Sequence, residues 1–118
     1  MITADIHGKG NNGYRLSLCG HAGYADKGKD IVCASATILA YTAAENLRRM
    51  YLSGRLKKPP DIRMREGDIF IQYVPEKDEI QETDGVFRII CAGYELLARD
   101  YPEFVSVKSA ETGESRLI

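Results

Sequence analysis

One long stripe of apolar side chains constrains the fold of this 118-residue chain more than any other feature. After Asp30 the apolar residues recur every three or four positions, which is the spacing of one face of an α-helix. The stripe consists of Val32, Ala36, Leu39, Ala43, Leu47 and Met50. Asp30 is a favourable N-cap, and Gly54, followed by Pro59 and Pro60, ends the element. A helix of this length requires a second layer on which to bury its apolar face.

Segments of alternating apolar residues on both sides of this helix predict that second layer. In chain order, the expected elements are strands at 1–6 and 14–19, the helix after Asp30, strands at 61–65 and 68–74, a helix at about 77–100 and a strand at 104–107. The order ββαββαβ predicts an α+β fold in which both helices pack on one face of a mainly antiparallel sheet. We expect a single domain over residues 1–118, with 109–118 as a loose polar tail.

Composition and charge restrict the class of protein. Hydrophobic residues make up 44% of the chain and charged residues 28%, as in ordinary globular proteins. The net charge of −1 gives no overall field for nucleic acid, so we interpret the basic cluster at residues 48–58 as a solvated surface. The longest apolar run, at 31–44, is too short to cross a bilayer, and the N-terminus lacks a secretory pattern. We therefore expect a cytoplasmic protein without a membrane partner.

The segment from Gly20 to Ser35 carries the strongest chemical signal. A short glycine-bounded loop separates His21 from Cys33. If His21 ends a strand and Cys33 begins a helix, the loop can bring the imidazole and the thiol together as a base and its nucleophile. The first turn of a helix also favours negative charge, which stabilises a thiolate. Cys33 is therefore the candidate nucleophile and His21 the candidate general base.

Neighbouring residues have further candidate roles. Asp30 is interpreted as a helix cap or as an orienter of the catalytic pair. The backbone N–H groups of Cys33 and Ala34 could hold a developing oxyanion. The loop between His21 and Cys33 could open for a substrate. Its candidate gating residues are Gly23, Tyr24 and Gly28.

Two other interpretations stay open. Cysteine is among the most often buried residues, so Cys33 could be structural, as we expect for Cys91 in the second helix. A metal site is the rival from another class, because Cys19 and His21 would point the same way from one strand, with Cys33 nearby. The candidate fourth ligands are Asp30, Asp26 and His7. No paired Cys-x-x-Cys motif supports zinc, so we expect no metal or other cofactor, and three cysteines do not favour a disulfide framework.

The segments Gly20-His21-Ala22 and Gly28-Lys29-Asp30-Ile31-Val32-Cys33-Ala34 resemble the bacterial ribosomal-processing cysteine protease family, Prp. The resemblance extends over nearly the whole chain, and the His-to-Cys segment is its diagnostic part. It implies that His21 is the general base and Cys33 the nucleophile. Thr37 stands where the family has a small hydroxyl residue, often serine.

The resemblance also implies a reaction and its partners. Members of the family look like homodimers that remove a short N-terminal extension from the precursor of a large-subunit ribosomal protein, cutting after paired aromatic residues. A loop that corresponds to residues 22–29 would move to admit the peptide. We therefore expect a cysteine endopeptidase with no direct nucleic-acid contact. The alternative is a ribosome-assembly module that binds the same peptide and leaves it intact.

Overall fold

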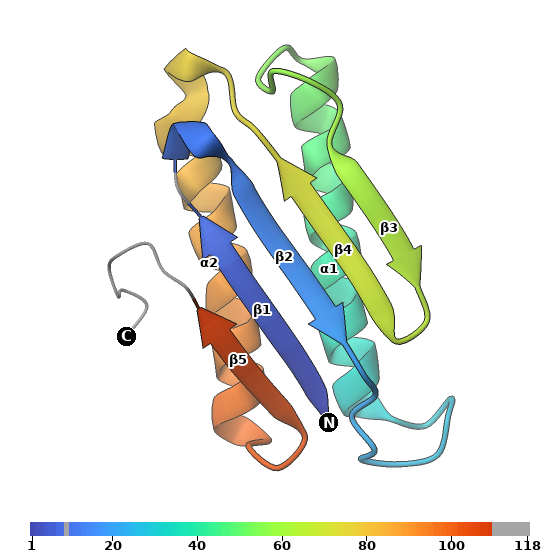
Figure 1. The fold of residues 1–118 in the computed structure, drawn as a ribbon. Helices are drawn as coiled ribbons and strands as arrows, with labels where there is room; N and C mark the ends of the chain where they lie inside the picture. The colour runs from blue at the N-terminus through green and yellow to red at the C-terminus, as the bar shows by residue number, and fades with distance from the viewer. Residues whose placement is uncertain (9, 110–118) are drawn as a thin grey trace.

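A computed structural model describes residues 1–8 and 10–109 of the chain, and Figure 1 shows the arrangement of their helices and strands. The strands are β1 (Ile2–Gly8), β2 (Tyr14–Cys19), β3 (Asp61–Arg65), β4 (Asp68–Tyr73) and β5 (Val105–Ser109). The helices are α1 (Ile31–Leu52) and α2 (Ile80–Asp100), with short 3-10 turns η1 (Gly10–Asn12) and η2 (Lys77–Glu79). The predicted α+β class and the order ββαββαβ are confirmed.

The strands form one sheet in the order β3-β4-β2-β1-β5. β1 and β2 form a hairpin, β3 and β4 form a second one, and β2 pairs with β4 in the middle of the sheet. These three pairings are antiparallel, whereas β5 lies parallel to β1 at the sheet edge. The strand order brings the end of β2 beside the turn between β3 and β4.

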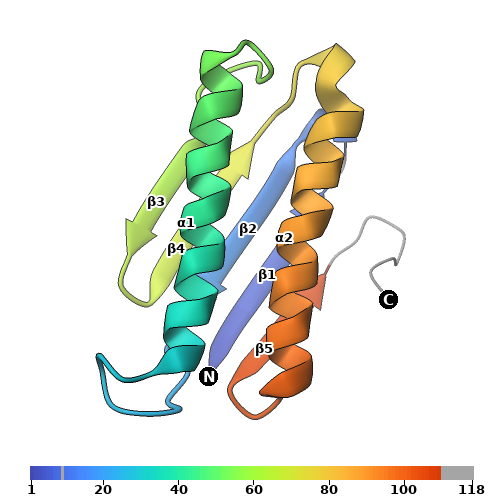
Figure 2. The same cartoon turned by 180° about the vertical axis from the view of Figure 1, so that it is seen from behind.

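Both helices cover the same face of the sheet, as Figure 2 shows from behind. α1 packs on β4, and α2 packs on β1 and β5. The inward residues of β1 and β2 and most of the predicted α1 stripe are buried. The apolar face of the alternating strands and the apolar stripe of the helix therefore pack together in one core. These buried residues include Ile2, Ala4, Ile6, Leu16, Leu18, Val32, Ala36, Ala43, Leu47 and Met50.

The helices approach each other closely where α2 contains a glycine. A Cβ built on Gly93 would lie 2.7 Å from Cδ2 of Leu39, so a side chain there would displace Leu39. Tyr94 of α2 also contacts α1 directly. Its buried hydroxyl donates to the carbonyl oxygen of Ala36 at 2.8 Å. Glycine is unfavourable inside a helix, and here close packing of α1 on α2 explains its presence.

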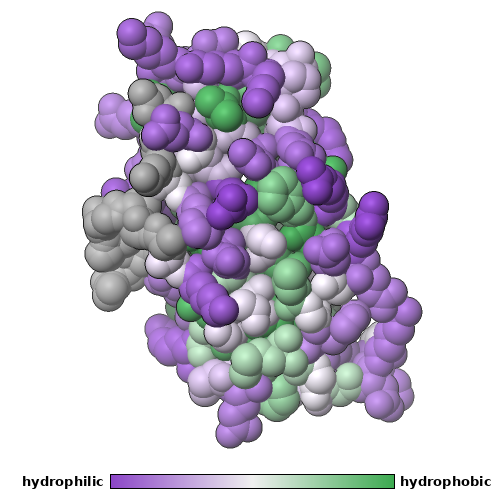
Figure 3. Space-filling model, viewed as in Figure 1, coloured by the Kyte–Doolittle hydropathy of each residue, from purple (hydrophilic) through white to green (hydrophobic). Residues whose placement is uncertain are grey.

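The other face of the sheet has no helix on it, and Figure 3 shows that polar side chains cover much of this face. Arg63 stacks over the ring of Phe70, with its Cζ 4.8 Å from the ring centroid. His7 lies on the same face, and its Nε2 is 2.8 Å from Oδ1 of Asp5. Within the described residues, neither α1 nor α2 has an apolar stretch long enough to cross a membrane.

Several element ends differ from the sequence predictions. The first strand extends to Gly8, and the second helix begins as the 3-10 turn η2 before α2 starts at Ile80. The last strand starts and ends later than predicted. Ser109, assigned to the tail, is therefore part of β5 and pairs with Ile6. The rest of the predicted tail, 110–118, lies outside the described residues.

Candidate active site

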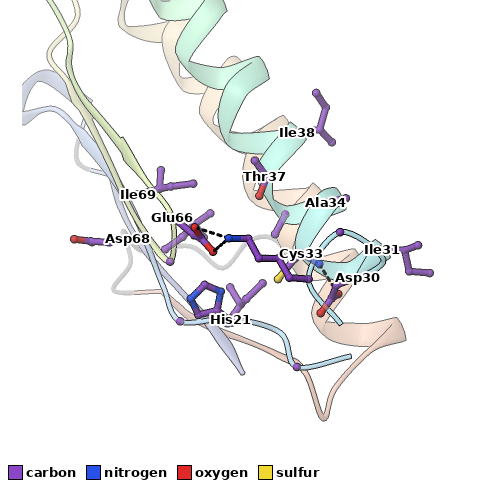
Figure 4. Close-up of a pocket in the computed structure, with 18 of the residues that line it drawn as sticks. His21, Asp30, Ile31, Cys33, Ala34, Thr37, Ile38, Glu66, Asp68 and Ile69 are labelled. Carbon is purple, nitrogen blue, oxygen red and sulfur yellow. Dashed lines mark hydrogen bonds and ion pairs between the residues drawn. The ribbon is translucent and has the colours of Figure 1, made fainter. Parts of the chain in front are cut away.

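The residues predicted to carry chemistry converge where α1 begins. The β2–α1 loop, the first turns of α1 and the β3–β4 turn border a groove of about 970 Å³. His21 and Cys33 both line this groove, and Figure 4 shows the imidazole ring and the sulfur facing the same space. Apolar side chains line the groove away from this pair: Ile38, Tyr41, Met64 and Ile69.

Asp30 joins the start of α1 to the preceding loop. Its Oδ1 accepts the backbone N–H groups of Val32 at 3.0 Å and Cys33 at 2.9 Å. Its Oδ2 accepts those of Tyr24 at 3.0 Å and Ala25 at 3.3 Å. Desolvation raises the pKa of this carboxyl, but the four hydrogen bonds outweigh it and hold the pKa below 3.8. All four donors are backbone groups, which supports the helix-cap interpretation of Asp30.

Cys33 lies in the first turn of α1 and is half-buried. Its Sγ accepts the backbone N–H of Ala22 at 3.2 Å. The N–H of Ala22 and the N-terminus of α1 both place positive partial charge beside the sulfur. The predicted placement of Cys33 at a helix start is therefore confirmed, and the loop supplies a donor that the sequence did not indicate.

His21 reaches the groove by a different route from the one predicted. The strand alternation that would place Cys19 and His21 on one face stops at Cys19, where β2 ends. Gly20 has a φ of 97°, and a Cβ there would collide with the carbonyl oxygen of Met1. This left-handed residue turns the chain out of the sheet. As a result His21 faces the groove, whereas Cys19 is exposed at the end of β2.

The predicted oxyanion donors already have partners. The N–H of Cys33 donates to Oδ1 of Asp30, and the N–H of Ala34 donates to the backbone oxygen of Asp30 at 3.0 Å. Asp30 therefore accepts both backbone N–H groups that are predicted to hold a developing oxyanion. In this conformation neither group is free to receive a substrate oxygen, and their oxyanion role stays a prediction.

The predicted gating loop is exposed and is held at its two sides. The ring of Tyr24 packs edge-on against Tyr101 and Phe104, with centroid distances of 5.6 and 5.2 Å. On the other side Lys27 Nζ donates to Oε1 of Glu66 at 3.2 Å, and this contact links the loop to the β3–β4 turn across the groove that both residues line. Gly23 and Gly28, at φ 71° and 88°, have no atoms within 4 Å of a built Cβ. These two open left-handed positions lie on either side of residues 24–27, and the gating role of this loop stays a prediction.

The rival metal site is not assembled. Across residues 1–8 and 10–109, no group of three His, Cys, Asp or Glu side chains is placed to hold a metal ion. Cys19 lies on the open face of the sheet, and His7 is occupied with Asp5 at the far end of β1. Cys91 is buried in the core, as predicted. All three cysteines are free thiols.

The family model described as cysteine protease Prp matches residues 1–106. The chain belongs to the Prp family. As a member of this family it is a cysteine protease, and the sequence resemblance is confirmed. A comparison with curated proteins gave no match.

Solved structures share the Prp fold. The ribosomal processing protease Prp from S. aureus, in complex with a covalently linked product peptide, is 21% identical, with a TM-score of 0.69 over 92% of this chain and 98% of that one. The same protease with a substrate peptide is 19% identical, with a TM-score of 0.65 over the same shares. SMU.848 from Streptococcus mutans is 25% identical, with a TM-score of 0.66 over 92% of each chain.

Sequence reasoning missed three contacts at this Prp site: the Ala22 N–H on Cys33, the Lys27–Glu66 ion pair and the position of Gly67 beside His21. The first uses the backbone N–H of Ala22, which any residue other than proline would supply, so the residue type does not indicate it. The other two join the β2–α1 loop to a turn about forty residues later in the chain, so they depend on the order of the strands in the sheet. The Glu66-Gly67 pair was visible in the sequence only as a turn signal.

Proposed function

We propose that this Prp-family protease is an endopeptidase that removes a short N-terminal extension from a large-subunit ribosomal protein precursor, with Cys33 as nucleophile and His21 as general base. The observation that carries the assignment is the position of the Cys33 sulfur. It lies at the start of α1, accepts a backbone N–H and shares a groove with His21. The match to the Prp family and the substrate and product complexes of the S. aureus protease support the reaction class.

The reaction uses one base twice. His21 takes the proton of the Cys33 thiol, and the thiolate attacks the scissile carbonyl carbon. The resulting imidazolium gives that proton to the leaving amine, which leaves an acyl group on the sulfur as a thioester. A water molecule then attacks the thioester while His21 takes its proton. The carboxyl product departs, and the returned proton restores the thiol.

The groove suits an extended peptide with apolar side chains. Ile38 and Tyr41 are more than half exposed although they are large and apolar, and they line the groove on α1. Met64 and Ile69 line it from β3 and β4. Aromatic side chains of a peptide would bury this surface, which provides binding free energy in the same groove that Cys33 lines. This agrees with the paired aromatic residues that the family resemblance implies before the cut.

A peptide that spans the precursor's extension and the first mature residues tests the proposal. The unaltered protein should cut it once, whereas Cys33→Ala should bind it without cutting. His21→Ala should be nearly as inactive, and the double variant little worse than either, because the two groups act as a unit. The matched controls are Cys19→Ala and His7→Ala, which alter an exposed cysteine and a histidine on the open sheet face. Undiminished cutting by Cys33→Ala would refute the mechanism, and tight binding without cutting by the unaltered protein would favour the peptide-binding module.

We also propose that the protein works in the cytoplasm and that it is a homodimer, the latter as the family resemblance implies. Light scattering of the purified chain measures its mass directly. A monomer at working concentration would remove the dimer from the proposal and leave the chemistry intact.

A further inference from the structure

A glycine in the β3–β4 turn lies against the candidate general base. A Cβ built on Gly67 would lie 2.7 Å from Nε2 of His21, 3.2 Å from Cε1 and 3.5 Å from Cδ2. Nε2 and Cε1 are the ring atoms farthest from the backbone, and Cδ2 lies between Nε2 and Cγ. The ring therefore rests where a side chain at position 67 would be, and Figure 4 shows it between the β3–β4 turn and Cys33.

The backbone of the same turn holds the residue before the base. The N–H of Gly20 donates to the carbonyl oxygen of Gly67 at 2.9 Å. This bond lies next to the last residue pair of β2 and β4, Cys19 and Asp68. One residue thus fixes the backbone next to His21 and leaves room for its side chain. Both relations depend on the pairing of β2 with β4, so the sheet itself sets the position of the imidazole.

We propose that Gly67 is a positioning residue for His21, which rests on the proposed role of His21 as the general base. Without a side chain, Gly67 forms a niche that holds the imidazole on the Cys33 side of the groove. Any Cβ at this position moves the ring. Because the atoms it meets are the far end of a rotatable side chain, the ring can swing aside while the fold holds. A side chain at position 67 then lowers activity by disturbing the geometry of the His21–Cys33 pair.

Backbone strain has to be separated from this steric effect. Gly67 has a φ of 73°, a conformation in which any side chain is strained. Gly54 has a φ of 81°, lies after the C-terminus of α1 and has no atom within 4 Å of a built Cβ. Gly54→Ala therefore introduces the same kind of strain without touching His21. It is the matched control for Gly67→Ala.

The test compares the unaltered protein, Gly67→Ala, Gly54→Ala and His21→Ala in three measurements. These are kcat and KM for peptide cleavage, the midpoint of urea unfolding, and the ratio of Cys33 alkylation rates at about pH 6 and about pH 9. We expect Gly67→Ala to lose about a hundredfold in kcat with little change in KM, because a displaced base loses rate rather than binding. Its alkylation ratio should approach that of His21→Ala. Its unfolding midpoint should match that of Gly54→Ala.

The alkylation ratio distinguishes the failure of this inference from the failure of the proposed function. If the unaltered protein and His21→Ala give the same ratio, His21 does not act on Cys33, and both proposals fall. If they differ but Gly67→Ala behaves like Gly54→Ala, the positioning role alone is wrong. Asparagine tolerates a positive φ better than alanine, so Gly67→Asn and Gly54→Asn repeat the comparison if the alanine variant is too unstable. A much larger loss of stability in Gly67→Asn than in Gly54→Asn would make Gly67 a folding residue and overturn the inference.

Discussion

The backbone N–H of Ala22 donates to the sulfur of Cys33 across 3.2 Å, so the residue after the candidate base touches the candidate nucleophile directly. Ala22 is buried, although the loop that follows it is exposed. This contact ties the start of the β2–α1 loop to the first turn of α1 and places a donor beside Cys33.

Cys33 should be the most reactive thiol of the chain at low pH. We expect iodoacetamide to modify Cys33 much faster than Cys19 at about pH 6, since both thiols are accessible but only Cys33 has a helix start and a backbone donor beside it. Cys91 is buried and should be protected in the folded protein. Mass spectrometry of the adducts measures all three sites in one sample. Equal labelling of Cys19 and Cys33 would contradict the assignment.

Asp30→Asn should separate the two groups of contacts that Asp30 makes. An asparagine keeps one acceptor oxygen for the N–H groups of Val32 and Cys33, but its NH₂ group would face the N–H groups of Tyr24 and Ala25. We expect a loss of about 1 kcal/mol in the free energy of unfolding and faster hydrogen exchange over residues 23–29. Asp26→Asn, in the same exposed loop, is the control. Unchanged exchange in Asp30→Asn would show that the carboxylate does not hold the loop.

The same carboxylate predicts a pH dependence of stability. Its pKa is lower in the folded protein than the ordinary value of 3.8, so the unfolded chain binds the proton more readily. The stabilisation from Asp30 is therefore complete above the ordinary pKa and is lost as the pH falls through the folded pKa. Urea unfolding of the unaltered protein and of Asp30→Asn should converge between about pH 5 and about pH 2. A difference that stays constant over this range would contradict the lowered pKa.

Breaking the Lys27–Glu66 pair should loosen the loop without destabilising the fold. Both side chains are mostly exposed, so we expect Glu66→Gln to change the free energy of unfolding by less than about 1 kcal/mol. Trypsin should nevertheless cut faster after Lys27, because the lysine is no longer held across the groove. Glu76→Gln, at another exposed position, is the control. Equal cutting rates in both variants would mean that the ion pair does not restrain the loop.

Tyr94→Phe should destabilise the contact between the helices. The substitution removes the hydrogen bond from the Tyr94 hydroxyl to the carbonyl oxygen of Ala36, which keeps its own hydrogen bond inside α1, so we expect a cost of about 1 kcal/mol. Tyr51→Phe removes a hydroxyl from a partly exposed tyrosine on α1 and should change stability little. Urea unfolding of both variants measures the difference. Similar midpoints would show that the Tyr94 hydrogen bond contributes nothing net.

Local patterns were sufficient to predict the helices, the strands and the helix cap, because residue spacing and capping chemistry act within a few positions of the chain. Val32 to Met50 and the Asp30 cap are examples. The sequence did not predict the strand order. The predicted continuation of the strand to His21 was wrong, because a single left-handed glycine, Gly20, ends the alternation of β2. From the sequence alone, Gly67 is only a turn signal between two predicted strands. Its contact with His21 exists only after β2 and β4 have paired.

The two oxygens of Asp30 serve different neighbours, and this division has a consequence for loop opening. Oδ1 holds the N–H groups of Val32 and Cys33 in the helix, whereas Oδ2 holds those of Tyr24 and Ala25 in the loop. If the loop leaves, only the Oδ2 bonds break, and water can replace them at an exposed position. The helix start that carries the sulfur keeps its cap throughout. Opening of the loop therefore leaves the cap of the helix that carries Cys33 intact, although the same side chain holds both the loop and the helix.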